Sequence, residues 1–171
     1  MPAFLTRMPA GIPGEVNRAQ QASIEPIAVT PQGTTGAPTA FGIPMVIDQT
    51  AGNVGNARMV AAGDTLASIY GLLVRPFPAF SSQDALGTST PPTQGPVDLL
   101  RRGYMSVKLS GATAAVKGGL VYIWTAAAGG GHIVGGFEAA NPTTNGFAFT
   151  GATFMGPADA NGNVEISFGL L

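Results

Sequence analysis

The chain has 171 residues, no cysteine, one histidine and a formal net charge of −1, and only 10% of its residues are charged. Without cysteine it has no disulfide framework, no thiolate nucleophile and no cysteine-based zinc site, and its near-neutral charge does not supply the basic face that nucleic-acid binding requires. The sequence also lacks an apolar run of about 20 residues that could span a membrane and an apolar signal segment at its start, so we expect neither nucleic acid nor a membrane as a partner, and synthesis in the cytoplasm.

Residues 1–40 are predicted to form a Pro/Gly-rich N-terminal arm that includes the first strand. Proline recurs too often here for a helix, and only residues 15–22 are compatible with one, of two turns at most. Phe4, Leu5 and Met8 are apolar residues of the arm with no obvious local core. They either fold back on their own domain or dock on a neighbouring subunit, and the sequence leaves both possibilities open.

Residues 41–171 are predicted to form the body, in which short β-type segments alternate with glycine and proline. Pro26 places the first strand at a sheet edge, and the most apolar strand, 120–125, is expected to be central. Residues 79–97 form a long surface loop. The expected strands cover 24–29, 42–47, 56–60, 68–75, 99–109, 120–125, a short strand within 129–137, 147–156 and the segment that follows residue 162.

The last two strands are expected to form a hairpin. Asn161-Gly162 is a strong signal for a type I′ turn between the strands that contain Phe154 and Ile166. Eight or nine short strands with almost no helix predict an all-β fold, either an antiparallel β-barrel or a jelly-roll-like sandwich with an extended N-terminal arm.

The candidate catalytic and ligand motifs are weak. In residues 111–119 Lys117 precedes the glycines, whereas a phosphate-binding loop needs glycine and lysine at the start of a helix. Residues 159–170 lack the glycine and the final acid of a calcium loop. His132 could act as a base, but a single histidine on a glycine-rich loop is typical of an exposed turn. We therefore expect no catalytic, cofactor-binding or metal-binding residues, and a protein that is not an enzyme.

Two segments combine arginine with aromatic side chains. Arginine and aromatic residues are enriched at protein interfaces, since both give large contact area and directed contacts. In the alternative interpretation the phenylalanines belong to the core and the arginines are solvated. Together with the apolar residues of the arm, the predicted protein interface comprises Phe4, Leu5, Met8, Arg75, Phe77, Phe80, Arg101, Arg102 and Tyr104.

Three segments resemble the phage structural cement (capsid decoration) protein family. Members carry, in this order, a segment of the form G-hydrophobic-L-V-R-x-Y/F-P, then R-R-G-Y-M, then K-G-G-x-V-Y. The corresponding segments here are 70–78 (YGLLVRPFP), 100–109 (LRRGYMSVKL) and 114–122 (AAVKGGLVY). The opening of the chain is similar as well, so the resemblance covers roughly residues 1–125, and the C-terminal hairpin fits more loosely.

The resemblance implies a virion protein on the outer surface of a shell built from an HK97-like major capsid protein. It also implies a β-barrel or jelly-roll-like body and self-association as a homodimer or homotrimer, with no cofactor. Two other functions stay open: another phage virion module, such as a tail or spike receptor-binding domain, and a small hydrolase that uses His132.

Overall fold

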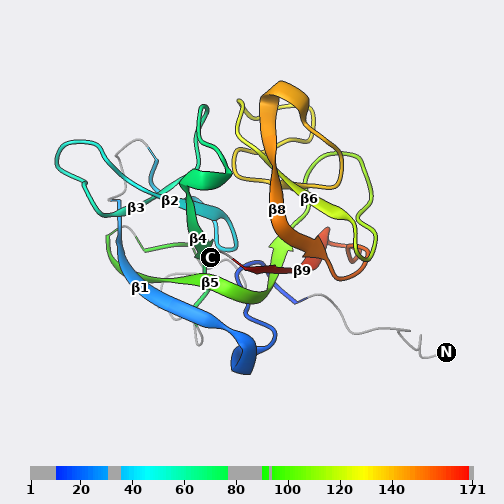
Figure 1. Cartoon of the computed structure of the whole chain (residues 1–171), viewed down its shortest axis with the longest axis horizontal. Coiled ribbons are helices and arrows are strands. Elements are labelled where there is room, and N and C mark those ends of the chain that lie inside the picture. Colours follow the sequence, from blue (N-terminus) through cyan, green and yellow to red (C-terminus); the bar gives the residue numbers. More distant parts are fainter. Residues whose placement is uncertain (1–10, 31–35, 77–89, 93, 170–171) are drawn as a thin grey trace.

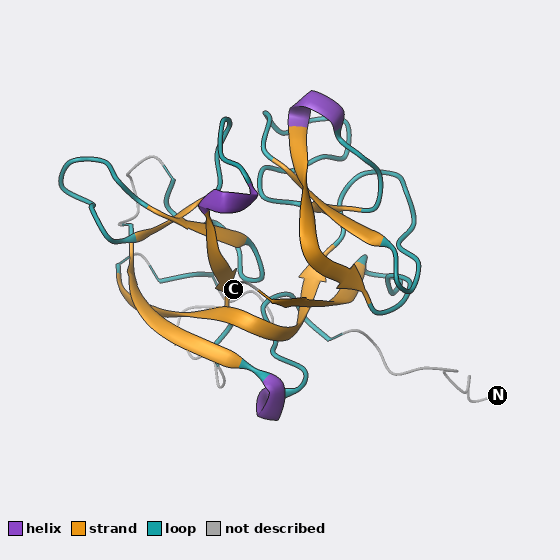
Figure 2. Ribbon diagram, in the orientation of Figure 1, coloured by secondary structure: helices purple, strands orange, loops and turns teal. Residues whose placement is uncertain are grey.

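The computed structural model describes residues 11–30, 36–76, 90–92 and 94–169. Its regular structure is almost entirely β, which confirms the predicted fold class (Figure 2). Three single-turn 3₁₀ helices occur in the described part, at Ala19–Gln21 (η1), Leu66–Ser68 (η2) and Thr143–Asn145 (η3). The strands are β1 (Ser23–Val29), β2 (Pro44–Ile47), β3 (Ala57–Met59), β4 (Ile69–Leu73), β5 (Gly95–Lys108), β6 (Leu120–Trp124), β7 (Phe137–Glu138), β8 (Gly146–Phe154) and β9 (Asn163–Gly169).

Five of these strands close into a barrel. The sheet order begins β1-β3-β2-β4-β5, and β1 also pairs with β5, so the fifth strand returns to the first. β1 runs antiparallel to β5 over its whole length but meets β3 only at the parallel pair Val29 and Ala57. Pro26, which lacks an N–H donor, lies in the part of β1 that has no partner on its other side, as the prediction of an edge position requires.

The remaining strands form a second ring that shares β5 with the barrel. The order continues β5-β9-β8-β6-β7. Just beyond β5, Leu109 forms a parallel bridge with Phe137 of β7, and the Ser110 N–H donates to the Phe137 carbonyl at 2.8 Å. This seam joins the last strand to the extension of β5. Figure 1 shows the result as two lobes, with β1 to β4 on one side and β6 and β8 on the other.

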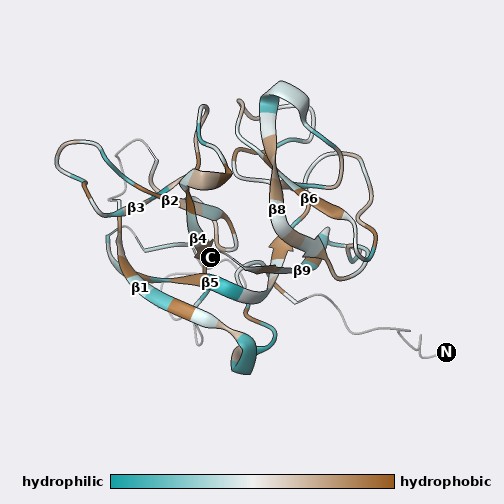
Figure 3. Ribbon diagram, viewed as in Figure 1, coloured by the Kyte–Doolittle hydropathy of each residue, from teal (hydrophilic) through white to brown (hydrophobic). Residues whose placement is uncertain are grey.

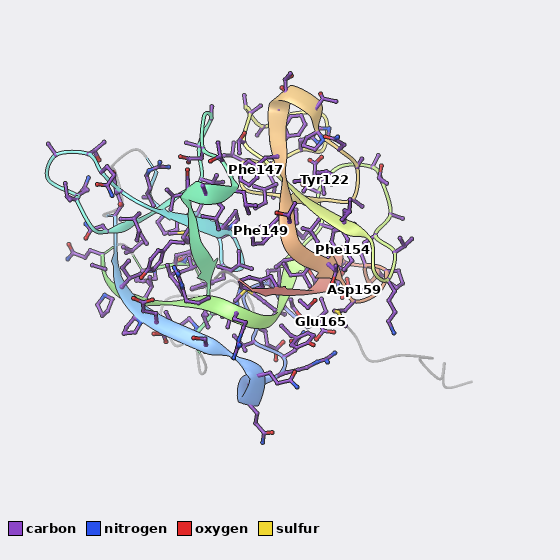
Figure 4. All side chains as sticks on the ribbon, in the orientation of Figure 1. Tyr122, Phe147, Phe149, Phe154, Asp159 and Glu165 are labelled. Carbon is purple, nitrogen blue, oxygen red and sulfur yellow. The ribbon has the colours of Figure 1, made fainter. Side chains whose placement is uncertain are left out.

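Pairs of adjacent apolar residues explain why the two lobes pack together. Successive side chains of a strand point to opposite faces. The barrel strands carry buried pairs at 45–46, 72–73 and 99–100, so one member of each pair fills the barrel and the other faces the second ring. The second ring contributes large aromatic side chains to the shared core, among them Phe149 and Phe154 of β8 (Figure 4). In the described chain, the hydrophobic core therefore spans both lobes.

Asp48 is a buried carboxylate at the end of β2. It is 1% exposed and accepts hydrogen bonds from the Thr30 hydroxyl at 3.1 Å, from the Thr50 N–H at 2.9 Å and from the Thr50 hydroxyl. Burial raises the pKa of Asp48, but these hydrogen bonds and the charge of Arg58 outweigh that effect and leave the pKa below its ordinary value. The carboxylate thus holds the start of the β2–β3 connection to the end of β1.

The structure corrects several details of the predicted elements. The strand 120–125 is not central: β6 lies next to the last strand of the order, whereas β5 contacts β1, β4 and β9. The segment 15–22 forms a β-bridge at Val16 and a single 3₁₀ turn, not a two-turn helix. β5 starts at Gly95, so the last three residues of the predicted 79–97 loop are strand. The predicted first strand, within residues 1–40, is β1, and it is a strand of the barrel.

The C-terminal hairpin is present with a different turn. Phe154 pairs with Ile166, as expected. A type I′ turn needs positive φ at both central residues, but among the described residues Thr143 is the one non-glycine residue with positive φ, so Asn161 does not qualify. Gly162 has φ 74°, and its N–H donates to the Asp159 carbonyl at 2.9 Å. The left-handed glycine therefore follows the turn, a position that accommodates an extra residue before β9.

Candidate protein interface

The described part of the N-terminal segment packs on its own body. Residues 11–18 run beside β5, where the Gly14 N–H donates to the Ser106 carbonyl at 2.8 Å and the Asn17 N–H donates to the Tyr104 carbonyl at 3.1 Å. Val16 packs against the main core. Phe4, Leu5 and Met8 lie outside the described residues, so their role in an interface stays a prediction.

Arg75 holds this N-terminal segment in place. Its backbone N–H donates to the Gly14 carbonyl at 2.8 Å, and its Nε donates to the Pro13 carbonyl at 3.3 Å. Its guanidinium carbon lies 5.0 Å from the centre of the Phe41 ring. Arg75 is therefore engaged within the chain. Phe77 and Phe80, predicted as its interface neighbours, lie outside the described residues.

Arg101 is also engaged within the chain. Its guanidinium stacks on Tyr70 at 3.8 Å from the ring centre and donates to the Tyr70 carbonyl, and its Nε lies 3.9 Å from Glu25. The Tyr70 hydroxyl donates to Glu25 at 2.6 Å. This hydrogen bond, with burial as a second cause, raises the pKa of Tyr70. The cluster joins β1, β4 and β5 on the outside of the barrel.

Arg102 and Tyr104 lie together at an open groove. Arg102 is exposed, and its side chain makes no hydrogen bond or ion pair with any other described residue. The Arg18 guanidinium lies 3.9 Å from the centre of the Tyr104 ring, and Arg18 forms an ion pair with Glu165 of β9 at 3.4 Å. The groove has a volume of about 550 Å³ and is lined by Gln20, Gln21, Arg102, Gly103, Tyr104, Gly151, Ser167, Phe168 and Gly169.

His132 is half-buried and paired, which corrects its prediction as an exposed turn residue. Its ring stacks on Trp124 with the centres 4.0 Å apart and the planes 14° apart. Its Nδ1 lies 2.5 Å from Oε1 of Glu138, a carboxylate that is 3% exposed. Glu138 follows Phe137 in β7, so this pair lies at the seam of the second ring. The sequence offered little sign of it, because nothing in the six-residue spacing indicates that the two side chains meet.

The hydrogen bonds of this cluster join three parts of the fold. The Ser110 hydroxyl contacts Glu138, the partner of His132: it lies within hydrogen-bond distance of the Phe137 carbonyl at 3.3 Å and of the Glu138 carboxylate at 3.4 Å. Activation of a serine requires its hydrogen bond to the histidine base, and no such bond to His132 is present in the described chain. The three side chains instead connect the 129–132 turn, β7 and the end of β5, so they stabilise the seam.

Other classes of site receive no support from the described residues. No group of three or more histidine, aspartate or glutamate residues is arranged to hold a metal ion among them. Within the same residues, no helix is long and apolar enough to cross a membrane. Two of the predicted interface residues, Arg102 and Tyr104, line the same groove at an accessible surface.

Comparisons with known proteins identify a relationship over the whole chain. The family described as XM1 gp53 minor capsid protein matches residues 1–168. A chain in the solved structure of the capsid of Myoviridae phage XM1 is similar in fold, with a TM-score of 0.69 and 18% sequence identity over 98% of this chain and 95% of that chain. At that identity the structural likeness shows the fold alone. A search of curated proteins finds no match.

Proposed function

Because this chain belongs to the XM1 gp53 minor capsid protein family, we propose that it is a cement protein, which binds the outer surface of the major capsid protein shell and stabilises it. Membership of this family makes it a phage capsid protein of the virion and confirms the resemblance to phage capsid proteins seen in its sequence. The family match over residues 1–168 is the observation that carries the proposal.

The distribution of charge supports a role in assembly. Three arginines of the described chain form ion pairs, Arg18 with Glu165, Arg58 with Asp64 and Arg101 with Glu25. Since only 10% of all residues are charged, this internal pairing leaves few free charges on the surface. Such a surface does little to keep a lone monomer soluble. Contact with a protein shell would bury part of it.

Attachment would depend on many weak contacts. We expect an HK97-like major capsid protein as the partner, and self-association as a homodimer or homotrimer placed at symmetry axes of the shell. An oligomer with several binding feet gains affinity because each further contact is intramolecular. Contacts that cross the boundaries between capsomers would then resist the separation of the capsomers under internal pressure.

The rival functions have less support. A structural capsid family suggests a non-enzymatic role. A receptor-binding module for glycans usually presents an exposed aromatic platform, but one face of Trp124, the single tryptophan, is covered by His132. Nothing else in the described residues favours the tail or spike alternative over a capsid role.

The proposal can be tested with shells that lack this protein. The purified protein should co-sediment with such shells and raise their melting temperature. Electron microscopy of the particles should show added density on the outer surface. If the protein stayed in the supernatant, the cement function would be wrong, and density on the tail would establish the rival module.

A further inference from the structure

The groove at Arg102 has features that suit a negatively charged partner. Its lining includes Gln20, Gln21, Tyr104 and Arg102, and it includes no aspartate or glutamate. The cationic side chains of Arg102 and Lys117 make no hydrogen bond or ion pair with another described residue, but Lys117 does not line the groove. An unpaired guanidinium beside donor amides is complementary to a carboxylate, which it can bind with two parallel hydrogen bonds.

A second positive group lies next to the groove. Arg18 stacks on Tyr104, which also lines the groove. The Arg18 side chain is 44% exposed. Its partner Glu165 compensates one of the two guanidinium charges, so the neighbourhood of Arg102 keeps a net positive charge. This contrasts with the whole chain, whose net charge is −1. Figure 3 shows a hydrophilic stretch within β5.

The floor of the groove has room for a polypeptide backbone. It includes Gly103, Gly151 and Gly169, none of which projects a side chain. Gly151 has φ 90°, and a Cβ there would lie 3.3 Å from the Gly169 carbonyl oxygen, so a larger residue would both strain the chain and narrow the groove. β9 pairs with β8 only at residues 152–154, which leaves the β8 backbone at Gly151 without a strand on that side among the described residues.

We propose that this groove binds an extended, carboxylate-bearing segment of the shell protein, with Arg102 as the residue that binds the carboxylate. The inference rests on the proposed cement function and specifies its partner chemistry. The Arg102 guanidinium is available to an external ligand, whereas the side chains of Arg75 and Arg101, from the same sequence pattern, bind groups within the chain. The glycine floor admits the backbone of the segment, and the amides of Gln20 and Gln21 are available to its peptide groups.

The test compares Arg102→Ala with Lys117→Ala in binding to shells that lack this protein. Each change removes one free cation, but only the first lies in the groove. Arg102→Ala should raise the protein concentration needed for half-saturation by about tenfold, because a charge-assisted hydrogen-bond pair is lost. Arg102→Lys should give an intermediate effect, since it keeps the charge and loses the planar fork. Lys117→Ala should bind like the unaltered protein.

Two outcomes would overturn the inference: equal binding by Arg102→Ala and the unaltered protein, or equal weakening by Arg102→Ala and Lys117→Ala. The second would show a general charge effect. Failure of the unaltered protein to bind shells would instead overturn the cement function itself. Thermal unfolding of each variant should match that of the unaltered protein, because the Arg102 side chain makes no hydrogen bond or ion pair in the described chain. A variant that unfolds early would show a structural role for Arg102 and would also contradict the inference.

Discussion

Replacing His132 with alanine should weaken the seam that closes the second ring. The change leaves the Glu138 carboxylate, 3% exposed, with the Ser110 hydroxyl at 3.4 Å as its remaining side-chain partner. A buried polar group that loses its partner costs about 1–3 kcal/mol, and loss of the stack on Trp124 adds about 0.5–1.5 kcal/mol. Since the His132 side chain is 30% exposed, we expect a loss in the free energy of unfolding near the middle of this sum, about 3 kcal/mol.

Urea unfolding at neutral pH, followed by circular dichroism, measures this loss. In a chain of this size each 1 kcal/mol lowers the melting temperature by about 2–4 °C, so the expected fall is roughly 6–12 °C. Ile133→Ala is the matched control, because Ile133 is adjacent and 43% exposed. The double variant His132→Ala, Glu138→Leu should recover part of the stability, since no carboxylate is left buried. If His132→Ala cost no more than Ile133→Ala, the seam would not depend on this pair.

Two further predictions concern the core and the buried carboxylate. Phe149→Ala should lower the free energy of unfolding by about 3–5 kcal/mol, because the ring is buried against Phe137 and Phe168 at centre distances of 6.4 and 5.8 Å. Thr150→Ala, at the exposed neighbouring residue, is the control. Equal losses in the two variants would contradict the placement of Phe149 in the core. The pKa of Asp48 is lowered on folding, so its contribution to stability is fully present above the ordinary value of 3.8 and is lost as the pH falls through the folded pKa. Asp48→Asn should therefore destabilise the protein at pH 7 by about 1–3 kcal/mol and flatten the loss of stability in acid, as urea midpoints across this pH range would show; an unchanged acid slope would refute the prediction.

Local patterns predicted most of the strands. The alternating residues in 103–109 and the apolar run in 120–125 correspond to β5 and β6. These patterns predict strands because successive side chains of a strand point to opposite faces, so neighbouring residues show which faces are buried. The position of a strand in the sheet is a different matter. The segment 120–125 is the most apolar, yet β5 is the strand with the most partners, since it pairs with β1, β4 and β9. Local patterns do not predict these pairings, because they join residues far apart in the chain.

The same limit applies to the candidate site. The two Arg-aromatic segments were predicted to form a protein interface, and this stays a prediction. The sequence could not separate Arg101, which stacks on Tyr70, from its neighbour Arg102, whose side chain has no hydrogen bond or ion pair in the described chain. The difference comes from a bulge in the pairing of β1 with β5, where Ser23 pairs with Arg102 and Ile24 pairs with Leu100. Arg101 is the unpaired residue between them. The predicted type I′ turn at Asn161-Gly162 was wrong, because only Gly162 takes the left-handed conformation there.

The sharing of β5 also has a consequence for synthesis. β1 pairs with β5 through residues as distant as Ser23 and Arg102, so β1 and β4 have no common partner until most of β5 has left the ribosome. The barrel can close at that point, while the second ring must wait for β9, which ends at Gly169. The barrel of the nascent chain can thus fold first, and the second ring then assembles on β5, which is already a strand of the barrel. Long-range pairing of this kind folds slowly, and until β9 is synthesised the apolar outer face of the barrel is exposed to other chains.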